Sequence, residues 1–403
     1  MEPGGVDAMI DSLPQAEFDA RKRRLCEKME TEGLDAICVF NAGRIFYISG
    51  FHHVATERPL VLVVLSNGDT SLLVPHLEEE NVPVRTPWIT DVHVYREYPG
   101  QKHPMEYLRE IFVRKGISSK HIGVDSDGYG AIMGYRGPSL SEQLPGTTLT
   151  HLGDYIDRMR MVKSDSEIAM IRRSAEFGHL AHSFLQDLIE VGKTELDITL
   201  QASAKATEVM LKMQRPDYEP VGRGSGPRAT LTSGPKTAYN HRRAGARKIK
   251  PGDVILTAAG CDYGGYQSEL ERTLIVGEPT PRIQKYFELE TAAQKVAFDA
   301  IKPGIPCSQV EATVNEFLES ENLMELTRTH IGHGIGIEGH EAPFLDVGDP
   351  TMIEPGMVFT PEPCLFVPGF AGFRHSDTVV VTEDGIDYIT RYSRNLEDLI
   401  VPE

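Results

Sequence analysis

The chain has 403 residues, of which 40% are hydrophobic and 25% are charged, a composition typical of a globular protein long enough for two domains. Its formal net charge of −18 argues against nucleic acid as a partner, because proteins that bind nucleic acid present basic patches to the phosphates. No apolar run reaches the roughly 18 residues that a membrane-spanning helix needs, so we expect no membrane partner.

The cysteines and the N-terminal segment both bear on the cellular location. The five cysteines are scattered, odd in number and without the spacing of a metal site, which indicates free thiols in a reducing compartment. Residues 1–15 are acidic and lack the basic and apolar regions of a signal peptide. We therefore expect a cytoplasmic protein.

The first part of the chain alternates helical and strand patterns. Residues 17–32 are charged and place Phe18, Leu25 and Met29 at helical spacing, which predicts an amphipathic helix. Apolar runs predict buried strands at residues 35–40, 60–65, 71–75 and 121–125. This alternation predicts an α/β domain over residues 1–155.

A second domain is expected over residues 156–403. Ser164 lies three residues before Glu167, the pattern of a capping box at the start of a helix. Helical patterns then cover residues 166–191, 194–213, 283–301 and 307–320. Strands are expected at residues 373–381 and 386–390, near the end of the chain.

Residues 251–273 hold the stretch with the clearest chemical content. Residues 254–259 are apolar, and a Gly-Gly pair follows at residues 264–265, which predicts two strands joined by a tight turn. Glu269 and Glu271 are two residues apart on the second strand and should point to the same face. Adjacent carboxylates repel unless a cation, a shared proton or a metal offsets them. A solvated strand face, with Arg272 as a local partner, is the alternative interpretation.

Five segments resemble those of the creatinase, aminopeptidase P and prolidase superfamily. They are PGD at residues 251–253, SELERT at 268–273, HGIGIEGHEAP at 333–343, EPGMVFTPEP at 354–363 and GFRHSDTVVVTEDG at 372–385. The resemblance covers nearly the whole chain and implies an α+β protein. Its expected parts are an N-terminal α/β creatinase-like domain and a C-terminal "pita-bread" domain, in which helices back a curved antiparallel sheet.

The resemblance also identifies five positions that hold two metal ions in the peptidases of the superfamily. In this chain they are Ala258, Glu269, His333, Glu362 and Ser376. A methyl group donates no lone pair, and a serine hydroxyl is a poor substitute for a bridging carboxylate on a hard ion. We therefore expect no dinuclear metal site and no cofactor, with a single weakly held ion on Glu269, His333 and Glu362 as the alternative. Creatinase, the metal-free member, resembles this chain in its LERT string, at residues 270–273 here.

Resemblance to creatinase implies roles for the polar residues. His241 is expected to be the acid–base group, with His333 and His340 as further catalytic residues. Glu269, Glu271, Glu362 and His375 are expected to bind the substrate. Arg58, followed by Pro59, is expected to reach the substrate carboxylate of a neighbouring subunit, which implies a homodimer with shared active sites.

The sequence therefore predicts a hydrolase that acts on a C–N bond without a metal. The substrate would be a small cationic molecule that carries a carboxylate, with histidine as general acid and base. The alternatives are a metal-dependent Xaa-Pro aminopeptidase or dipeptidase with a degenerate site, a lyase or hydrolase of another charged osmolyte, and a non-catalytic relative. Fold alone does not choose among them.

Overall fold

The computed structural model describes residues 12–222, 224 and 226–403. Residues 1–11, which form most of the segment in which we expect no signal peptide, lie outside the described residues. The chain divides into two compact units, Leu13–Arg160 and Met161–Glu403. The boundary in the sequence falls at the end of the helix Gly153–Met161. No helix among the described residues is long and apolar enough to cross a membrane.

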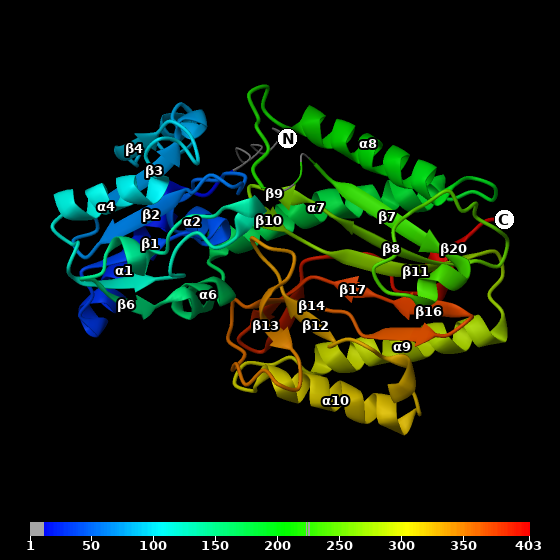
Figure 1. Cartoon of the computed structure of the whole chain (residues 1–403). Coiled ribbons are helices and arrows are strands. Elements are labelled where there is room, and N and C mark those ends of the chain that lie inside the picture. The colour runs from blue at the N-terminus through cyan, green and yellow to red at the C-terminus, as the bar shows by residue number, and fades with distance from the viewer. Residues whose placement is uncertain (1–11, 223, 225) are drawn as a thin grey trace, which may run out of the picture. The chain divides into compact units, whose positions relative to one another are not determined.

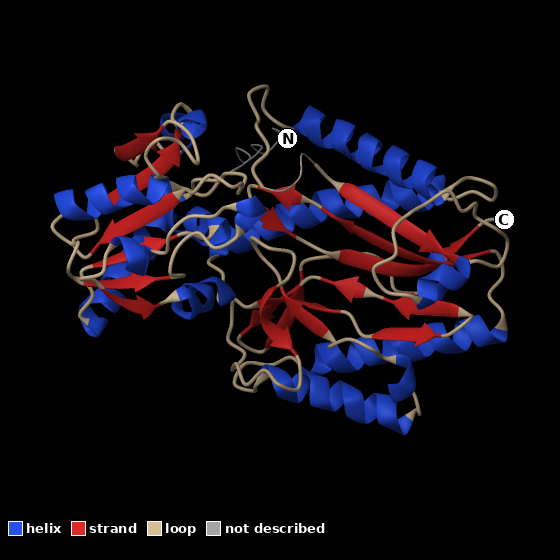
Figure 2. Cartoon of the chain, in the orientation of Figure 1, coloured by secondary structure: helices blue, strands red, loops and turns tan. Residues whose placement is uncertain are grey.

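The N-terminal unit is built on a six-stranded mixed sheet (Figures 1 and 2). The strand order is β4-β3-β2-β1-β5-β6, with antiparallel pairing of β2 to its two neighbours and parallel pairing elsewhere. The strands are β1 Ala36–Val39, β2 Val61–Leu65, β3 Thr70–Pro75, β4 Asp91–Tyr95, β5 His121–Val124 and β6 Thr148–His151. The apolar runs read from the sequence correspond to β1, β2, β3 and β5.

Helices flank this sheet and bury their apolar faces. They are α1 Gln15–Glu32, α2 Ala42–Ser49, α3 Asn81–Arg85, α4 Pro104–Arg114, α5 Leu140–Gln143 and α6 Gly153–Met161. In α1 the buried side chains include Phe18, Leu25 and Met29, the spacing that the sequence showed. The predicted α/β organisation of this part of the chain is confirmed.

The C-terminal unit begins with two long helices, α7 Asp165–Leu188 and α8 Glu195–Met213, packed on an antiparallel sheet (Figure 1). The predicted capping box is present, because Ser164 accepts from the amide of Glu167 and Glu167 accepts from that of Ser164. At Gly178 the helix lies so close to the sheet that a Cβ would approach Cα of Gly260 to 3.0 Å. Glycine is therefore required for this contact.

This first sheet has the order β17-β11-β8-β7, and β20 also pairs with β11. The strands are β7 Arg228–Ser233, β8 Val254–Gly260, β11 Leu270–Val276, β17 Ser376–Asp377 and β20 Ile400–Val401. The short pair β9 Asp262–Tyr263 and β10 Tyr266–Gln267 forms the predicted turn between β8 and β11.

A second five-stranded sheet of the same unit has the order β13-β12-β14-β18-β19. Its strands are β12 Gly332–Gly334, β13 Glu341–Leu345, β14 Val358–Pro361, β18 Val379–Thr382 and β19 Gly385–Tyr388. β15 Cys364–Val367 and β16 Ala371–Arg374 pair as a separate two-stranded hairpin. The helix α9 Pro281–Ala300 packs on this hairpin and on β14, and α10 Cys307–Ser320 packs on β13 (Figure 2). Strands are thus enclosed by one helix pair on each side, the expected pita-bread architecture.

Strand register places distant segments side by side. Glu271 on β11 pairs with Ala258 on β8 and with Ser376 on β17, and Ala258 pairs in turn with Thr230 on β7. Directly paired residues project from the same face of a sheet. Four positions therefore form one row across the sheet, with Glu271 between the two positions at which carboxylates were expected to be missing.

Candidate active site

Three carboxylates converge on this face of the first sheet. Glu269, Glu271 and Glu362 each offer an oxygen within 4.8 Å of the others, although Glu362 comes from the end of β14. Glu271 is 5% exposed. Burial raises the pKa of Glu269 and of Glu271, and the neighbouring negative charges raise both further. Such a cluster needs a positive charge to remain ionised.

Arg374, the last residue of β16, supplies that charge. Its Nη2 donates to Oε1 of Glu271 at 2.5 Å, and its Nε lies 2.5 Å from Oε2 of the same carboxylate. Its Nη1 is 3.8 Å from Glu362. Burial disfavours the guanidinium charge, but the surrounding carboxylates, Glu271 first among them, raise the pKa of Arg374. One charge-assisted hydrogen bond and one close ion contact thus hold the two groups together.

Arg374 was absent from the predicted site, although it lies in the GFRHSD segment that supported the resemblance. The sequence placed Glu271 and Glu362 around a cation of the substrate. In the structure the cation on Glu271 is the protein's own guanidinium. A signal was present, because Arg374 and Ser376 are two residues apart and share a strand face, but only Ser376 was considered.

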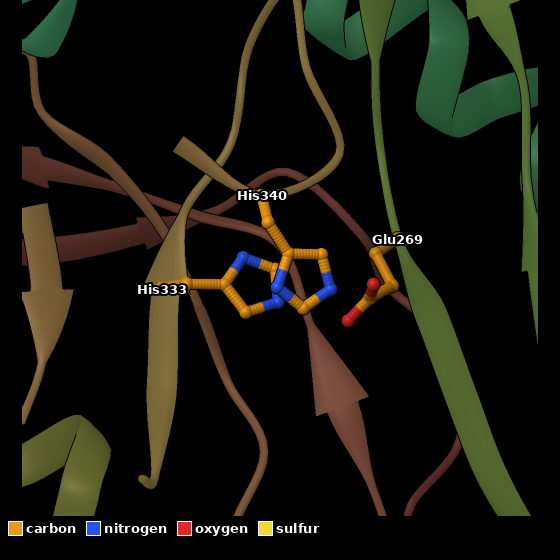
Figure 3. A group of neighbouring side chains, drawn as sticks. All are labelled: Glu269, His333 and His340. Atoms are coloured by element: carbon orange, nitrogen blue, oxygen red, sulfur yellow. The ribbon is translucent and has the colours of Figure 1, made fainter. Parts of the chain in front are cut away.

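Two histidines lie beside the carboxylates (Figure 3). The rings of His333 and His340 stack with centroids 3.7 Å apart, and Figure 3 shows Glu269 directed towards them from the opposite strand. His333 is fully buried, its Nδ1 donates to the carbonyl of Gly334 at 3.0 Å, and its Nε2 is 3.4 Å from Glu362.

These surroundings shift the pKa values of His333 and His340 in opposite directions. Burial opposes protonation of His333, but its contact with Glu362 and the nearby charge of Glu269 together outweigh burial and raise its pKa. Burial opposes ionisation of Glu362 as well. The positive charges of His333 and Arg374 outweigh burial and lower the pKa of Glu362. Burial lowers the pKa of His340, and the positive charge of His333 lowers it further. His333 is therefore suited to remain charged and His340 to accept a proton.

Two small cavities flank Ala258. One, of about 140 Å³, is lined by Glu269, Gln267 and Arg228, among others. The other, of about 100 Å³, is lined by His241, Arg242 and Arg374, among others. Ala258 and Thr230 line both cavities. A side chain larger than alanine at position 258 would therefore occupy part of both cavities.

The remaining predicted site residues occupy different surroundings. His241 lies on the exposed loop before β8, with a left-handed φ of 56° that is unusual for a residue other than glycine, and its side chain lines the second cavity. The structure thus brings His241 to the same hollow as Arg374. Arg58 belongs to the other unit and pairs with Glu57 and Glu97.

His375 is not brought to the site. It lies between Arg374 and Ser376, which face the carboxylates, so its side chain projects to the opposite face, towards α9. There its Nδ1 contacts Glu290, and its ring packs edge-on against Phe287 with centroids 5.0 Å apart. Its imidazole therefore contacts the protein interior rather than the cavities.

Comparison with known proteins agrees with this architecture. Residues 169–383 match metallopeptidase family M24, and residues 21–162 match the creatinase/prolidase N-terminal domain. The chain belongs to metallopeptidase family M24, and this confirms the predicted superfamily, the fold class and the enzyme class, a hydrolase that acts on C–N bonds.

Several relatives of the chain are peptidases by name. The chain is 28% identical to the Xaa-Pro dipeptidase of Lactobacillus delbrueckii subsp. lactis, over 93% of this chain and 98% of that protein. A crystal structure of the prolidase from Pyrococcus horikoshii OT3 superimposes with a TM-score of 0.77 at 25% identity, over 94% of this chain and 99% of that one. The N-terminal domain of the FACT complex subunit SPT16 from chickpea shares the fold, with a TM-score of 0.72 at 17% identity and coverage of 97% and 100%.

The family implies two metal ions, and the residues of this chain do not fit them. Ala258 and Ser376 take two of the five ligand positions, and the hydroxyl of Ser376 donates to Glu269 at 2.7 Å. The guanidinium of Arg374 lies against the remaining carboxylates, where it would repel a second cation. Among the described residues, the group that could hold a single ion away from the Glu271–Arg374 pair is Glu269, His333 and His340, whose ligand atoms lie within 4.8 Å of one another.

Proposed function

We propose that this chain hydrolyses a C–N bond of a small cationic substrate that carries a carboxylate, and that it does so without a metal ion. One observation carries the proposal: Arg374 occupies the carboxylate cluster as a fixed cation, in a site that lacks two of the five metal-ligand positions. A charged side chain in this place supplies electrostatic stabilisation that needs no reorganisation during the reaction.

The cationic end of the substrate binds to Glu269 and Glu362 in this proposal. Both are more accessible than Glu271, and Glu271 is committed to Arg374. A carboxylate pair attracts a planar cation and orients it through charge-assisted hydrogen bonds. The role of Glu271 differs from the one that the sequence suggested, because it positions Arg374 rather than touching the substrate.

The chemical step needs a proton acceptor and a proton donor. His241, in the cavity beside Arg374, takes a proton from water as the water oxygen attacks the carbon of the C–N bond. The C–N bond then breaks, and His241 returns the proton to the leaving nitrogen. The lowered pKa of His340 leaves its ring neutral and able to accept a hydrogen bond from the substrate, while charged His333 anchors Glu362.

Xaa-Pro dipeptide hydrolysis is the second candidate. The observation in its favour is the similarity to Xaa-Pro dipeptidases along nearly the full length of both chains. In this case Glu269, His333 and His340 would hold a single divalent ion, which would act as a Lewis acid on the peptide carbonyl.

Metal content and activity together distinguish the two candidates. We expect protein purified without added metal to contain less than one equivalent of transition metal by elemental analysis. Because no step of the proposed reaction uses a metal, turnover should be unchanged after dialysis against EDTA. The substrates to compare are creatine, other guanidino acids, cyclic amidines and Xaa-Pro dipeptides. Two bound equivalents, or EDTA-sensitive cleavage of an Xaa-Pro dipeptide, would contradict the proposal.

We further propose a homodimer in which Arg58 completes the site of the partner subunit. Two-fold dimers are the commonest oligomers, and Arg58 of the N-terminal unit is paired with the carboxylates of Glu57 and Glu97, a contact that a substrate carboxylate could replace. Light scattering should give twice the mass of the chain.

Mixed dimers test the shared site. Arg58→Ala and His241→Ala subunits, each weakly active alone, should regain activity when unfolded and refolded together, because one site of each mixed dimer is then complete. Arg114→Ala, on the same unit, is the control that should behave as wild type. A fully active monomer would contradict this proposal.

A further inference from the structure

We infer that the cavity beside His241 is a carboxylate-binding subsite whose main ligand is Arg242. This inference rests on the proposed function for the identity of the substrate, and it deepens it by assigning the acidic end of the substrate to a place in this chain. The substrate would then be a zwitterion that lies across Ala258, with its cation towards Glu269.

The lining of the cavity is basic and able to donate hydrogen bonds. The cavity, of about 100 Å³, is lined by three basic residues, His241, Arg242 and Arg374. Asn240 and Thr232 also line it. Glu271 already neutralises Arg374 through two contacts, and Nη1 of Arg374 is turned towards Oδ1 of Asn240 at 3.4 Å. A carboxylate in the cavity would therefore find its unsatisfied charge at Arg242.

Arg242 has no ion pair within the described part of the chain. Its guanidinium lies 5.4 Å from the ring centre of Tyr239, and this aromatic contact leaves its N–H groups available. Two other basic residues near this loop are paired, since Arg247 pairs with Asp253 and Lys236 lies 3.6 Å from Glu195. Arg243, the next residue, is exposed and does not line the cavity, so Arg242 is the lining cation that is left for an acidic ligand.

The neighbouring cavity has the opposite character. It is lined by Glu269, which lies within 4.8 Å of the other two carboxylates, and its one cationic side chain, Arg228, is turned to Gln267 at 3.4 Å. Ala258 and Thr230 are common to both cavities, so the small methyl group separates a negative end from a positive end. A guanidinium and a carboxylate form paired hydrogen bonds in one plane, which fixes the acidic end of a ligand as well as attracting it.

Calorimetric binding of matched probes to the full-length protein tests this subsite. The probes are 4-guanidinobutyrate and its amide, and Gly-Pro and Gly-Pro amide, so that each pair differs only in the carboxylate. The wild type should bind each acid about tenfold more tightly than its amide, the effect of one charge-assisted hydrogen bond. Arg242→Ala should bind acid and amide equally, and Arg242→Lys should retain part of the difference.

Arg243→Ala is the matched control, because Arg243 is the next residue, is exposed, and does not line the cavity. It should keep the wild-type preference for the acids. Equal losses in Arg242→Ala and Arg243→Ala would show a general field effect and overturn the inference, as would a wild type that binds acids no better than amides. Turnover, followed separately as released urea or proline, tests the proposed function, so cleavage can fail while the acid preference persists.

Discussion

Replacement of Arg374 by alanine is expected to lower the free energy of unfolding at pH 7 by about 3–5 kcal/mol, the usual cost of removing one partner of a buried ion pair. The reason is that Glu271, only 5% exposed, would lose both contacts at 2.5 Å that balance its charge. Urea unfolding, followed by far-ultraviolet circular dichroism, measures this change. Activity should fall as well, because the remaining carboxylates would repel one another and lose their fixed positions.

The pH dependence of that loss has a definite sign. Burial raises the pKa of Glu271, and without Arg374 nothing in its immediate contacts opposes the rise. A carboxyl group whose pKa is raised in the folded state stabilises the fold below its ordinary pKa, and this contribution disappears as the pH rises through the raised value. The stability deficit of Arg374→Ala relative to the wild type should therefore shrink as the pH is lowered towards 4.5, the ordinary value for glutamate.

Two further variants identify the cause. Arg374→Ala combined with Glu271→Gln should recover a large part of the lost stability, because the buried group is then neutral. Arg391→Ala removes an exposed ion pair with Asp387 in the same unit and should change stability by about 1 kcal/mol or less. If Arg374→Ala were no more damaging than Arg391→Ala, or if the second substitution gave no recovery, Arg374 would not be the counter-charge of the cluster.

Much of the fold follows from local patterns in the sequence. The four long helices of the C-terminal unit begin and end within about three residues of their predicted bounds, because apolar spacing and the Ser164 cap are local signals. Alternation along one strand also placed Glu269 and Glu271 on a common face, and both reach the same carboxylate cluster. These features depend only on neighbours in the chain.

The register between distant strands could not be read in the same way. That Glu271 pairs with Ala258 and Ser376 is set by how β8, β11 and β17 align, and a shift of one residue would turn each side chain to the other face. His375 illustrates the consequence. Its motif favoured a role in the site, yet its neighbours Arg374 and Ser376 occupy the site face and direct its ring towards Glu290.

Arg374 was missed for a related reason. Alternation can place Arg374 on the face of Ser376, but it gives no sign that the side chain is buried, since arginine is usually exposed. Its importance appears only when two carboxylates more than ten residues away from it in the chain are placed against it. Ala258 and Ser376 remove two of the carboxylates that would hold metal ions. The negative charge that remains in the cluster is balanced by Arg374, so the missing carboxylates and the buried arginine belong to the same electrostatic arrangement.

Replacement of His241 by alanine is expected to reduce kcat by roughly a hundredfold or more, the usual contribution of a positioned acid–base group. The substrate's binding contacts in the proposal are with Glu269, Glu362, Arg242 and the partner's Arg58, and not with His241, so KM should change much less than kcat. The measurement is steady-state turnover on whichever compound of the substrate panel the wild type cleaves.

Chemical rescue separates proton transfer from a structural role. Because His241 is exposed and lines an open cavity, imidazole added to His241→Ala can enter the vacated space and should restore part of the turnover, increasingly as the pH rises through the pKa of imidazole. His179→Ala is the control, since His179 is exposed on α7, packs against Tyr392 and lines neither cavity. It should turn over as the wild type does and show no response to imidazole. Near-normal turnover by His241→Ala would instead direct attention to His340, whose pKa is lowered by burial and which has a ring nitrogen within 4.8 Å of the carboxylate of Glu269.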